Sequence, residues 1–148
     1  MAKKSSNDII SMMGDWFAKA PSLPKNIQDT LAKIAPILAL IFGIIGILGA
    51  LGGLGLLTIF SPFAMMEGMH GYGYGTGFIA AALWLVSSIF MLVAYPGLRA
   101  RKMKGWTMLF WSEAISFVGS LVSLAIVSGI IGAVIAFYLL YQIKSYYK

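Results

Sequence analysis

Lysine and arginine are confined to alternate connections between apolar stretches, and this distribution constrains the fold more than any other feature of the chain. Four apolar stretches, each long enough for a membrane-spanning helix, cover about 34–60, 76–95, 106–124 and 128–143. All eleven cationic residues lie before the first stretch, between the second and third, or after the fourth. Because cationic connections stay on the cytoplasmic side, the sequence predicts a multi-pass protein with both termini in the cytoplasm.

The composition agrees with a membrane protein and leaves no room for a separate soluble domain. Hydrophobic residues make up 59% of the 148-residue chain and charged residues only 11%, whereas globular domains carry about 25% charged residues. We expect a cytoplasmic segment, 1–33, and one transmembrane domain, 34–148. The predicted fold is all-α: a four-helix transmembrane bundle in the cell (inner) membrane, with an N-terminal amphipathic helix at the cytoplasmic interface.

The cytoplasmic segment combines an amphipathic pattern with basic residues. Apolar Ile9, Met13 and Trp16 recur at helical spacing. This pattern predicts a helix that lies on the membrane surface and ends before Pro21. Pro96 is expected to end the second apolar helix for the same reason. Cations that flank apolar stretches typically contact anionic lipid headgroups, so we expect lipids and not nucleic acid as partners.

Small residues recur along the first and fourth apolar stretches. Glycine three or four positions apart lets a second helix backbone approach closely, and such contacts drive helix association in lipid. The partner could be another helix of the same chain or the same helix of a neighbouring copy, and we expect a homo-oligomer. The glycines assigned to this packing are Gly43, Gly46, Gly49, Gly52, Gly53, Gly129 and Gly132.

The third apolar stretch carries a carboxyl group, Glu113, and a polar stripe. Its members follow at helical intervals and are Ser112, Ser116, Ser120 and Ser123. A carboxyl group inside a membrane is costly, so the stripe could line a proton, ion or solute path. The alternative is a buried hydrogen-bond seam between helices, with Ser87 and Ser88 of the second stretch opposite.

The connection between the first two stretches contains thioether, carboxylate and imidazole groups. These are soft and borderline ligands of the kind that bind copper, and the candidate ligands are Met65, Met66, Met69 and His70. The competing interpretation is an ordinary outer loop, in which the tyrosines join an interfacial aromatic belt and the glycines form turns.

Sequence motifs of enzymes are missing. There is no cysteine, no phosphate-binding glycine loop and no histidine pair of the metalloprotease kind. Glu67 and Glu113 are expected at different depths, so they cannot act together as a catalytic pair. The sequence therefore predicts a protein that is not an enzyme and that needs no cofactor.

The segment GWTMLFWSEAIS and the ending IGAVIAFYLLYQIKSYYK resemble small, uncharacterised four-helix integral membrane proteins of bacteria. The resemblance covers the C-terminal part of the chain, from Gly105 onward. It implies four transmembrane helices and a cytoplasmic C-terminus, and it carries no activity.

The residues together favour a structural or scaffolding membrane protein that associates with itself through its glycine-rich helix faces. A small channel or transporter that uses the polar stripe is the alternative, and a copper-binding outer loop is a weaker third hypothesis.

Overall fold

The computed structural model describes the backbone of residues 2–66 and 72–148 and the side chains of residues 7–59 and 75–148. Within these ranges the chain is helical and has no strand, so the predicted all-α class is confirmed. The elements in chain order are α1 (Ala2–Phe17), α2 (Lys25–Met66), α3 (Tyr72–Arg99), α4 (Met103–Val122), α5 (Ile126–Ile143) and a 3-10 turn, η1 (Lys144–Tyr146).

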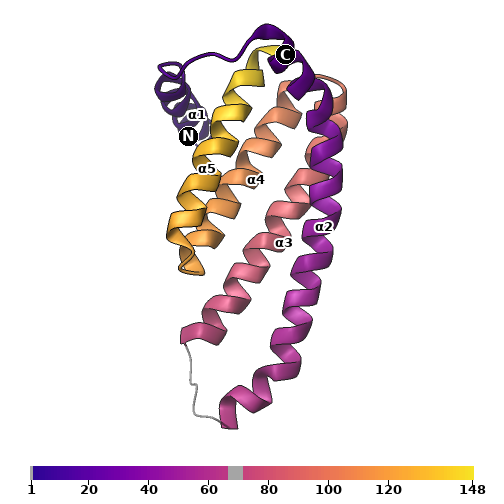
Figure 1. Cartoon of the computed structure of the whole chain (residues 1–148), viewed down its shortest axis with the longest axis vertical. Helices are drawn as coiled ribbons and strands as arrows, with labels where there is room; N and C mark the ends of the chain where they lie inside the picture. Colours follow the sequence, from indigo (N-terminus) through magenta and orange to yellow (C-terminus); the bar gives the residue numbers. More distant parts are fainter. Residues whose placement is uncertain (1, 67–71) are drawn as a thin grey trace.

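Helices α2 to α5 lie side by side and alternate in direction, with α3 between α2 and α4 and with α4 between α3 and α5 (Figure 1). Among the residues that the structure describes, three segments are long and apolar enough to cross a membrane: Lys25–Ile59, Gly75–Arg99 and Ile126–Tyr146. Helix α4 is not among them, because Glu113 and the serines lower its hydropathy. A crossing by α4 therefore stays a prediction.

Helices α2 and α3 extend past the predicted apolar stretches at both ends. Helix α2 already begins at Lys25 and continues through Pro36. The prediction that Pro96 ends the second apolar helix is wrong, because α3 continues to Arg99. Proline removes one backbone donor, and a long helix packed on both sides tolerates this loss. The helix ends instead in a turn where Lys102 N donates to Gly97 O at 2.9 Å.

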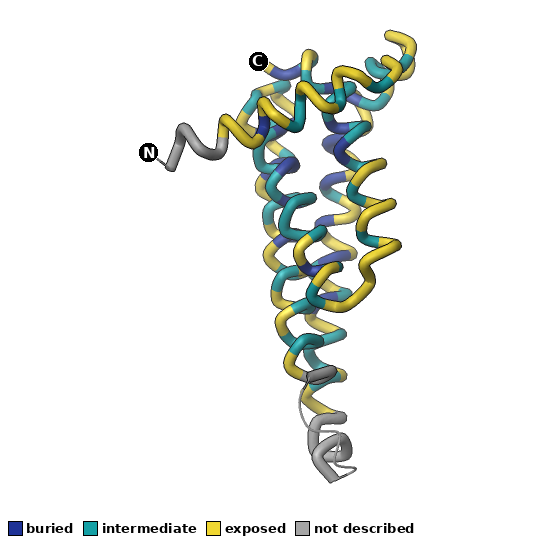
Figure 2. The backbone as a smooth tube through the Cα atoms, turned by 90° about the vertical axis from the view of Figure 1, so that its left-hand side faces the viewer, coloured by how far each residue is buried: buried dark blue, intermediate teal, exposed yellow. Residues whose placement is uncertain are grey.

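Helix α1 crosses the long axis of the other helices, near the end of the molecule that holds the C-terminus (Figure 2). It is attached to α5: the Tyr141 hydroxyl donates to Ile10 O at 2.6 Å, and the rings of Phe17 and Tyr141 stack with centroids 5.4 Å apart. Its apolar arc is only partly used by this contact. Met12 and Trp16 remain exposed, at 67% and 80%.

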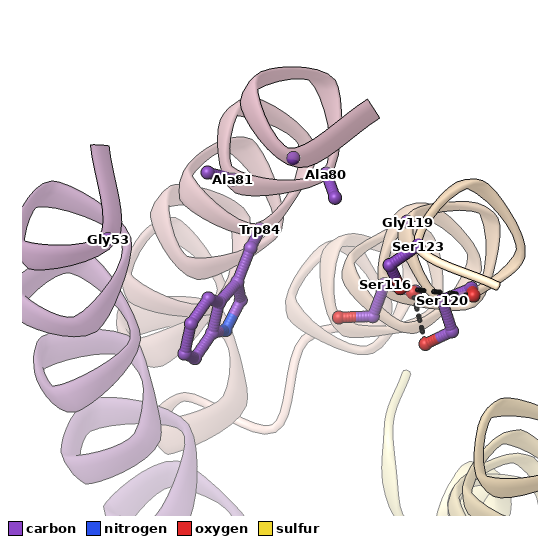
Figure 3. A pocket seen from close by; sticks show the side chains of 9 residues that line it. Gly53, Ala80, Ala81, Trp84, Ser116, Gly119, Ser120 and Ser123 are labelled. Atoms are coloured by element: carbon purple, nitrogen blue, oxygen red, sulfur yellow. Dashed lines mark hydrogen bonds between the residues drawn. The ribbon is translucent and has the colours of Figure 1, made fainter. Parts of the chain in front are cut away.

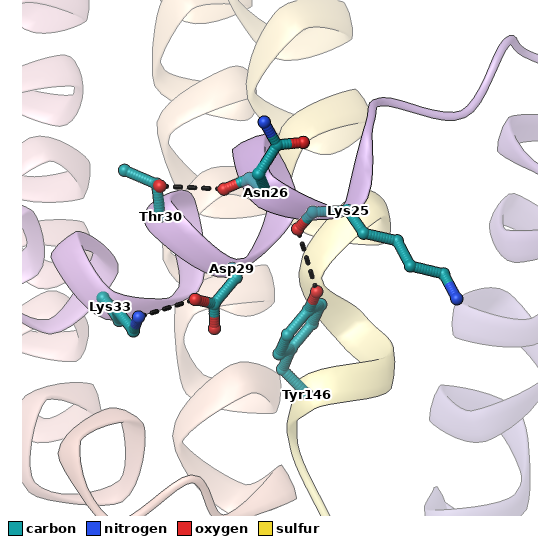
Figure 4. A network of polar contacts seen from close by, with 6 residues as sticks. All are labelled: Lys25, Asn26, Asp29, Thr30, Lys33 and Tyr146. Carbon is teal, nitrogen blue, oxygen red and sulfur yellow. Dashed lines mark hydrogen bonds and ion pairs between the residues drawn. The ribbon is translucent and has the colours of Figure 1, made fainter.

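The basic segments of the chain meet at one end of the molecule, which we call the basic end: the start of α2, the α3–α4 turn, η1 and the C-terminus. Lys148 N donates to Arg101 O at 3.0 Å, and Met103 N donates to Lys148 O at 2.7 Å. The Tyr146 hydroxyl donates to Lys25 O at 3.3 Å (Figure 4). Three connections that are distant in sequence are thus tied together by hydrogen bonds.

The opposite end, which we call the open end, comprises residues 52–59 of α2, 75–81 of α3 and the α4–α5 turn at 123–125. Helix α2 has 42 residues and α4 has 20, which correspond to lengths of about 63 and about 30 Å at ~1.5 Å per residue. The α2/α3 pair therefore extends past the α4–α5 turn (Figure 1). Among its described side chains, Leu56 and Ile59 of α2 and Ile79 of α3 are exposed.

Candidate functional site

Part of the serine stripe of α4 forms a buried seam of hydrogen bonds with α3. The Ser87 hydroxyl lies 3.0 Å from Ser112 O and 2.9 Å from the Ser116 hydroxyl. The Ser112 hydroxyl donates to Ser87 O at 2.9 Å. Ser87 and Ser112 are each at most 2% exposed. These hydroxyl groups are satisfied by one another, which is the arrangement expected of a packing seam.

The remaining serines of the stripe bond to their own helix. The Ser120 hydroxyl donates to Ser116 O at 3.1 Å, and the Ser123 hydroxyl donates to Ser120 O at 3.2 Å. Hydroxyl oxygens that donate in this way can still accept hydrogen bonds. This half of the stripe is therefore free to face a solute or water.

These serines and Trp84 line a cavity of about 400 Å³ between α2, α3 and α4. Figure 3 shows Trp84 and Ser116 pointing into the same space from α3 and α4, with Gly53 of α2 on the far side. We call it the tryptophan cleft. It lies toward the open end and brings the serines and one glycine of the sequence prediction to one place.

Glu113 occupies the junction of two further cavities. On one side is a cleft of about 250 Å³ between α4 and α5, which we call the serine cleft and which is lined by Ser116, Ser120, Ser128 and Gly129 among others. On the other side is a crevice of about 180 Å³ with walls from all four long helices, which we call the apolar crevice. The serine cleft shares Ser116 and Ser120 with the tryptophan cleft.

The Glu113 carboxyl group has no hydrogen-bond or ion-pair partner among the residues whose side chains are described. Within the same residues, the ion pair present joins Lys33 to Asp29 at 2.6 Å, far along the chain on α2. Lys102 and Lys104 at the basic end do not pair with Glu113. The carboxyl group is therefore the least compensated polar group of the predicted stripe.

The first glycines of α2 pack within the chain. A Cβ atom on Gly43 would lie 2.6 Å from Leu92, and one on Gly49 would lie 3.0 Å from Trp84. Gly46 faces Ser88 in the same way. These three glycines let α3 approach α2 closely, and α3 is thus the partner of this part of the face.

The later glycines of α2 are open. A Cβ atom on Gly52, Gly53 or Gly55 would meet no atom within 4 Å. The reason lies in the spacing, because three residues advance an α-helix by about 300°, so a row with this spacing winds around the helix. The row Gly43, Gly46, Gly49 and Gly52 therefore turns away from α3, whereas Gly53, seven residues after Gly46, stays on the α3 side and lines the tryptophan cleft.

The glycines of α5 do not pack against the glycines of α2. Gly129 packs on α4, where a Cβ atom on it would lie 2.6 Å from the Cβ of Ser120, and a Cβ atom on Gly132 would have no described neighbour within 4 Å.

The candidate copper ligands belong to a part of the chain that the structure does not describe: Met69 and His70 lie outside the described residues, and so do the side chains of Met65 and Met66. Among described residues there is no cluster of metal-binding side chains.

Sequence reasoning missed the aromatic core of the basic end. Trp106, the first residue of the third apolar stretch, is fully buried, and its indole donates to Leu140 O at 2.9 Å. Lys144 Nζ lies 5.1 Å from the centre of the Trp106 ring system, a cation–π geometry. Burial raises the pKa of the Tyr147 hydroxyl, and nearby Arg101 partly offsets this effect.

Comparisons of the chain with family models, with curated proteins and with solved structures gave no match. The resemblance of the C-terminal part to small bacterial four-helix membrane proteins therefore stays a prediction.

Proposed function

We propose that the chain is a structural or scaffolding membrane protein that associates with itself through the open end of α2. In this proposal α2, α3, α4 and α5 all cross the inner membrane, and both termini lie in the cytoplasm. The α1 helix lies in the cytoplasmic interface. The basic end faces anionic lipid headgroups.

The observation that carries the proposal is the open glycine segment of α2. A Cβ atom on Gly52 or Gly55 would have no neighbour within 4 Å among the described residues, and Leu56 and Ile59 beside them are exposed at 58% and 63%. Small residues flanked by large apolar ones allow two helices to pack closely in lipid. Since a Cβ atom on either glycine would meet nothing within 4 Å among the described residues, no described helix of the same chain packs on this surface.

The placement of α1 supports the interfacial part of the proposal. The helix crosses the other helices at the basic end (Figure 2), and Ile9, Met12 and Trp16 are exposed next to the residues that contact α5. An apolar arc of this kind, beside a polar face, buries itself in the headgroup region.

The test is a measurement of self-association in liposomes at increasing lipid-to-protein ratios, by energy transfer between labelled copies. The double variant Gly52→Leu and Gly55→Leu is expected to weaken association at least tenfold, because two bulky side chains separate the backbones. The matched control is Gly132→Leu, since Gly132 is an open glycine of α5. Equal association of the two variants would refute the proposal.

A small channel or transporter is the second candidate, and the unpaired Glu113 between two cavities favours it. This function requires that Glu113→Gln changes proton or potassium flux into liposomes and leaves self-association intact. Identical flux through both proteins, at the level of empty liposomes, would leave the structural proposal alone.

A further inference from the structure

The cavities around Glu113 have the chemistry of a ligand site. We infer that Glu113, the serine cleft and the apolar crevice bind a hydrophobic organic cation, an arylalkyl- or alkylammonium ion taken up from the bilayer. This inference goes beyond the structural role proposed above, and it does not depend on self-association.

The charge requirement comes from Glu113. The other residues that line the apolar crevice and the serine cleft carry neither charged nor titratable side chains. An ionised carboxylate in such surroundings is costly unless a cation compensates it. An ammonium group supplies both the opposite charge and charge-assisted hydrogen bonds to the carboxylate oxygens.

The hydrophobic requirement comes from the apolar crevice. Its walls include Leu38 and Phe42 of α2, Met91 of α3 and Leu139 of α5. A volume of about 180 Å³ accommodates one aromatic ring or a short alkyl chain, since an apolar cavity of roughly 150 Å³ holds benzene. The ligand tail is thus placed in the crevice, with its charged head at Glu113.

The serine cleft completes the head-group site. The Ser120 hydroxyl donates to Ser116 O, so its oxygen lone pairs remain available to accept from an ammonium N–H. An ammonium ion has three donors, and Glu113 with Ser120 offers acceptors for them on one side of the crevice. A neutral ligand of the same shape gains neither the charge nor this set of hydrogen bonds.

The route of entry is lateral. At the basic end the space between α2 and α5 is closed, because the Gln28 amide donates to Gln142 Oε1 at 3.2 Å and the Tyr147 hydroxyl donates to Ala32 O at 3.5 Å. Farther along, α2 and α5 stand on either side of α3 and α4 (Figure 1). The clustered cations of the basic end also repel a cationic ligand, so entry from the bilayer side is favoured.

The experiment uses the full chain in nanodiscs of zwitterionic phosphatidylcholine and two probes of matched shape, 3-phenylpropylammonium and 3-phenylpropan-1-ol. Calorimetric titration, with empty nanodiscs as the blank, is expected to show saturable binding of the ammonium probe. Glu113→Gln should weaken it at least tenfold. The alcohol should bind the wild type at least tenfold more weakly than the ammonium probe and should be insensitive to Glu113→Gln.

Two further variants keep the test decisive. Ala136→Leu leaves Glu113 in place and fills the crevice, so it should also weaken binding of the ammonium probe tenfold or more. Asp29→Asn removes an equal charge from the exposed Lys33 pair and should leave binding unchanged. Equal binding of the ammonium probe to wild type and Glu113→Gln, or equal binding of the two probes to the wild type, would overturn the inference. Neither result bears on self-association.

Discussion

The two ends of the molecule are built by opposite means. At the basic end, large side chains fill the space between helices: Trp106 and Phe110 are 0% and 1% exposed, and their ring centroids are 5.7 Å apart. At the open end, space between helices is left empty, as at Gly52 and Gly53. The large side chains of the basic end are covered within one chain, whereas the described residues of the open end leave these glycines uncovered.

This difference indicates which end stabilises the fold and which end is available to a second copy of the chain. The basic end joins the α1–α2 linker, the α3–α4 turn and the C-terminus by hydrogen bonds between distant residues. These hydrogen bonds join residues that are far apart in sequence, so each one holds a long loop closed. We therefore expect substitutions at the basic end to act on folding. The described residues of the open end make few contacts with the rest of the chain. Substitutions there should therefore act on association between copies rather than on folding.

The largest expected effect is at Trp106. Trp106→Ala removes a fully buried ring and leaves the Leu140 carbonyl without its donor. We expect a loss of about 3–5 kcal/mol in the free energy of unfolding, measured by denaturation in mixed detergent micelles. Trp84→Ala, at a ring that is 49% exposed, is the control. Equal losses would remove the contrast between the two ends.

The next effect is at the closest helix contact of the basic end. A Cβ atom on Gly97 would lie 2.7 Å from the Gly105 backbone. Gly97→Ala must therefore separate α3 from α4, at a cost of about 1–3 kcal/mol. Gly52→Ala, where nothing lies within 4 Å, should stay within about 0.5 kcal/mol of wild type. The same titration measures both, and a harmless Gly97→Ala would contradict the packing described.

The serine seam should give a smaller effect. Ser87→Ala removes a hydroxyl that bonds both Ser112 and Ser116, and hydrogen bonds between membrane helices contribute about 0.6–1.7 kcal/mol. Ser123→Ala removes only the local hydrogen bond to Ser120 O. It should therefore change the free energy of unfolding by much less than Ser87→Ala does. If Ser123→Ala is the more harmful substitution, the seam is not where α3 and α4 are joined.

The smallest effect is expected at the two helix turns. Leu124 and Arg101 have left-handed backbone angles, with φ of 59° and 55°. Leu124→Gly relieves this strain and should raise the unfolding free energy by about 1 kcal/mol. Arg101→Gly should give no net gain, because the guanidinium also lies 5.7 Å from the Tyr146 ring centre. A clear gain from Arg101→Gly would show that these contacts contribute little.

Hydropathy and charge predicted much of the fold, because the length of each apolar stretch can be read directly from the sequence. The pattern located the helices α2, α3, α4 and α5, whereas the amphipathic, interfacial character expected of the N-terminal helix stays a prediction. It misjudged Pro96, since the penalty for proline depends on what packs around the helix. It also could not show that three basic segments would meet at hydrogen-bond distance, because that depends on tertiary contacts.

The candidate site was only partly predictable. Helical spacing placed Ser112 and Ser116 on one face of α4, and the structure joins them to Ser87 of α3. Spacing could not reveal that Glu113 would face away from this seam, into cavities shared with α2 and α5. The winding of the glycine row follows from its spacing of three and was available from the sequence.

Disulfide trapping of single-cysteine variants tests the central contrast between the two ends most directly. The chain has no cysteine, so Leu56→Cys and Ile59→Cys at the open end can form only disulfides between copies. Ile37→Cys, at an exposed position of α2 nearer the basic end, is the matched control. In native membranes we expect oxidised dimers from Leu56→Cys and Ile59→Cys and almost none from Ile37→Cys. Equal trapping at all three positions, or trapping at Ile37→Cys alone, would contradict the account.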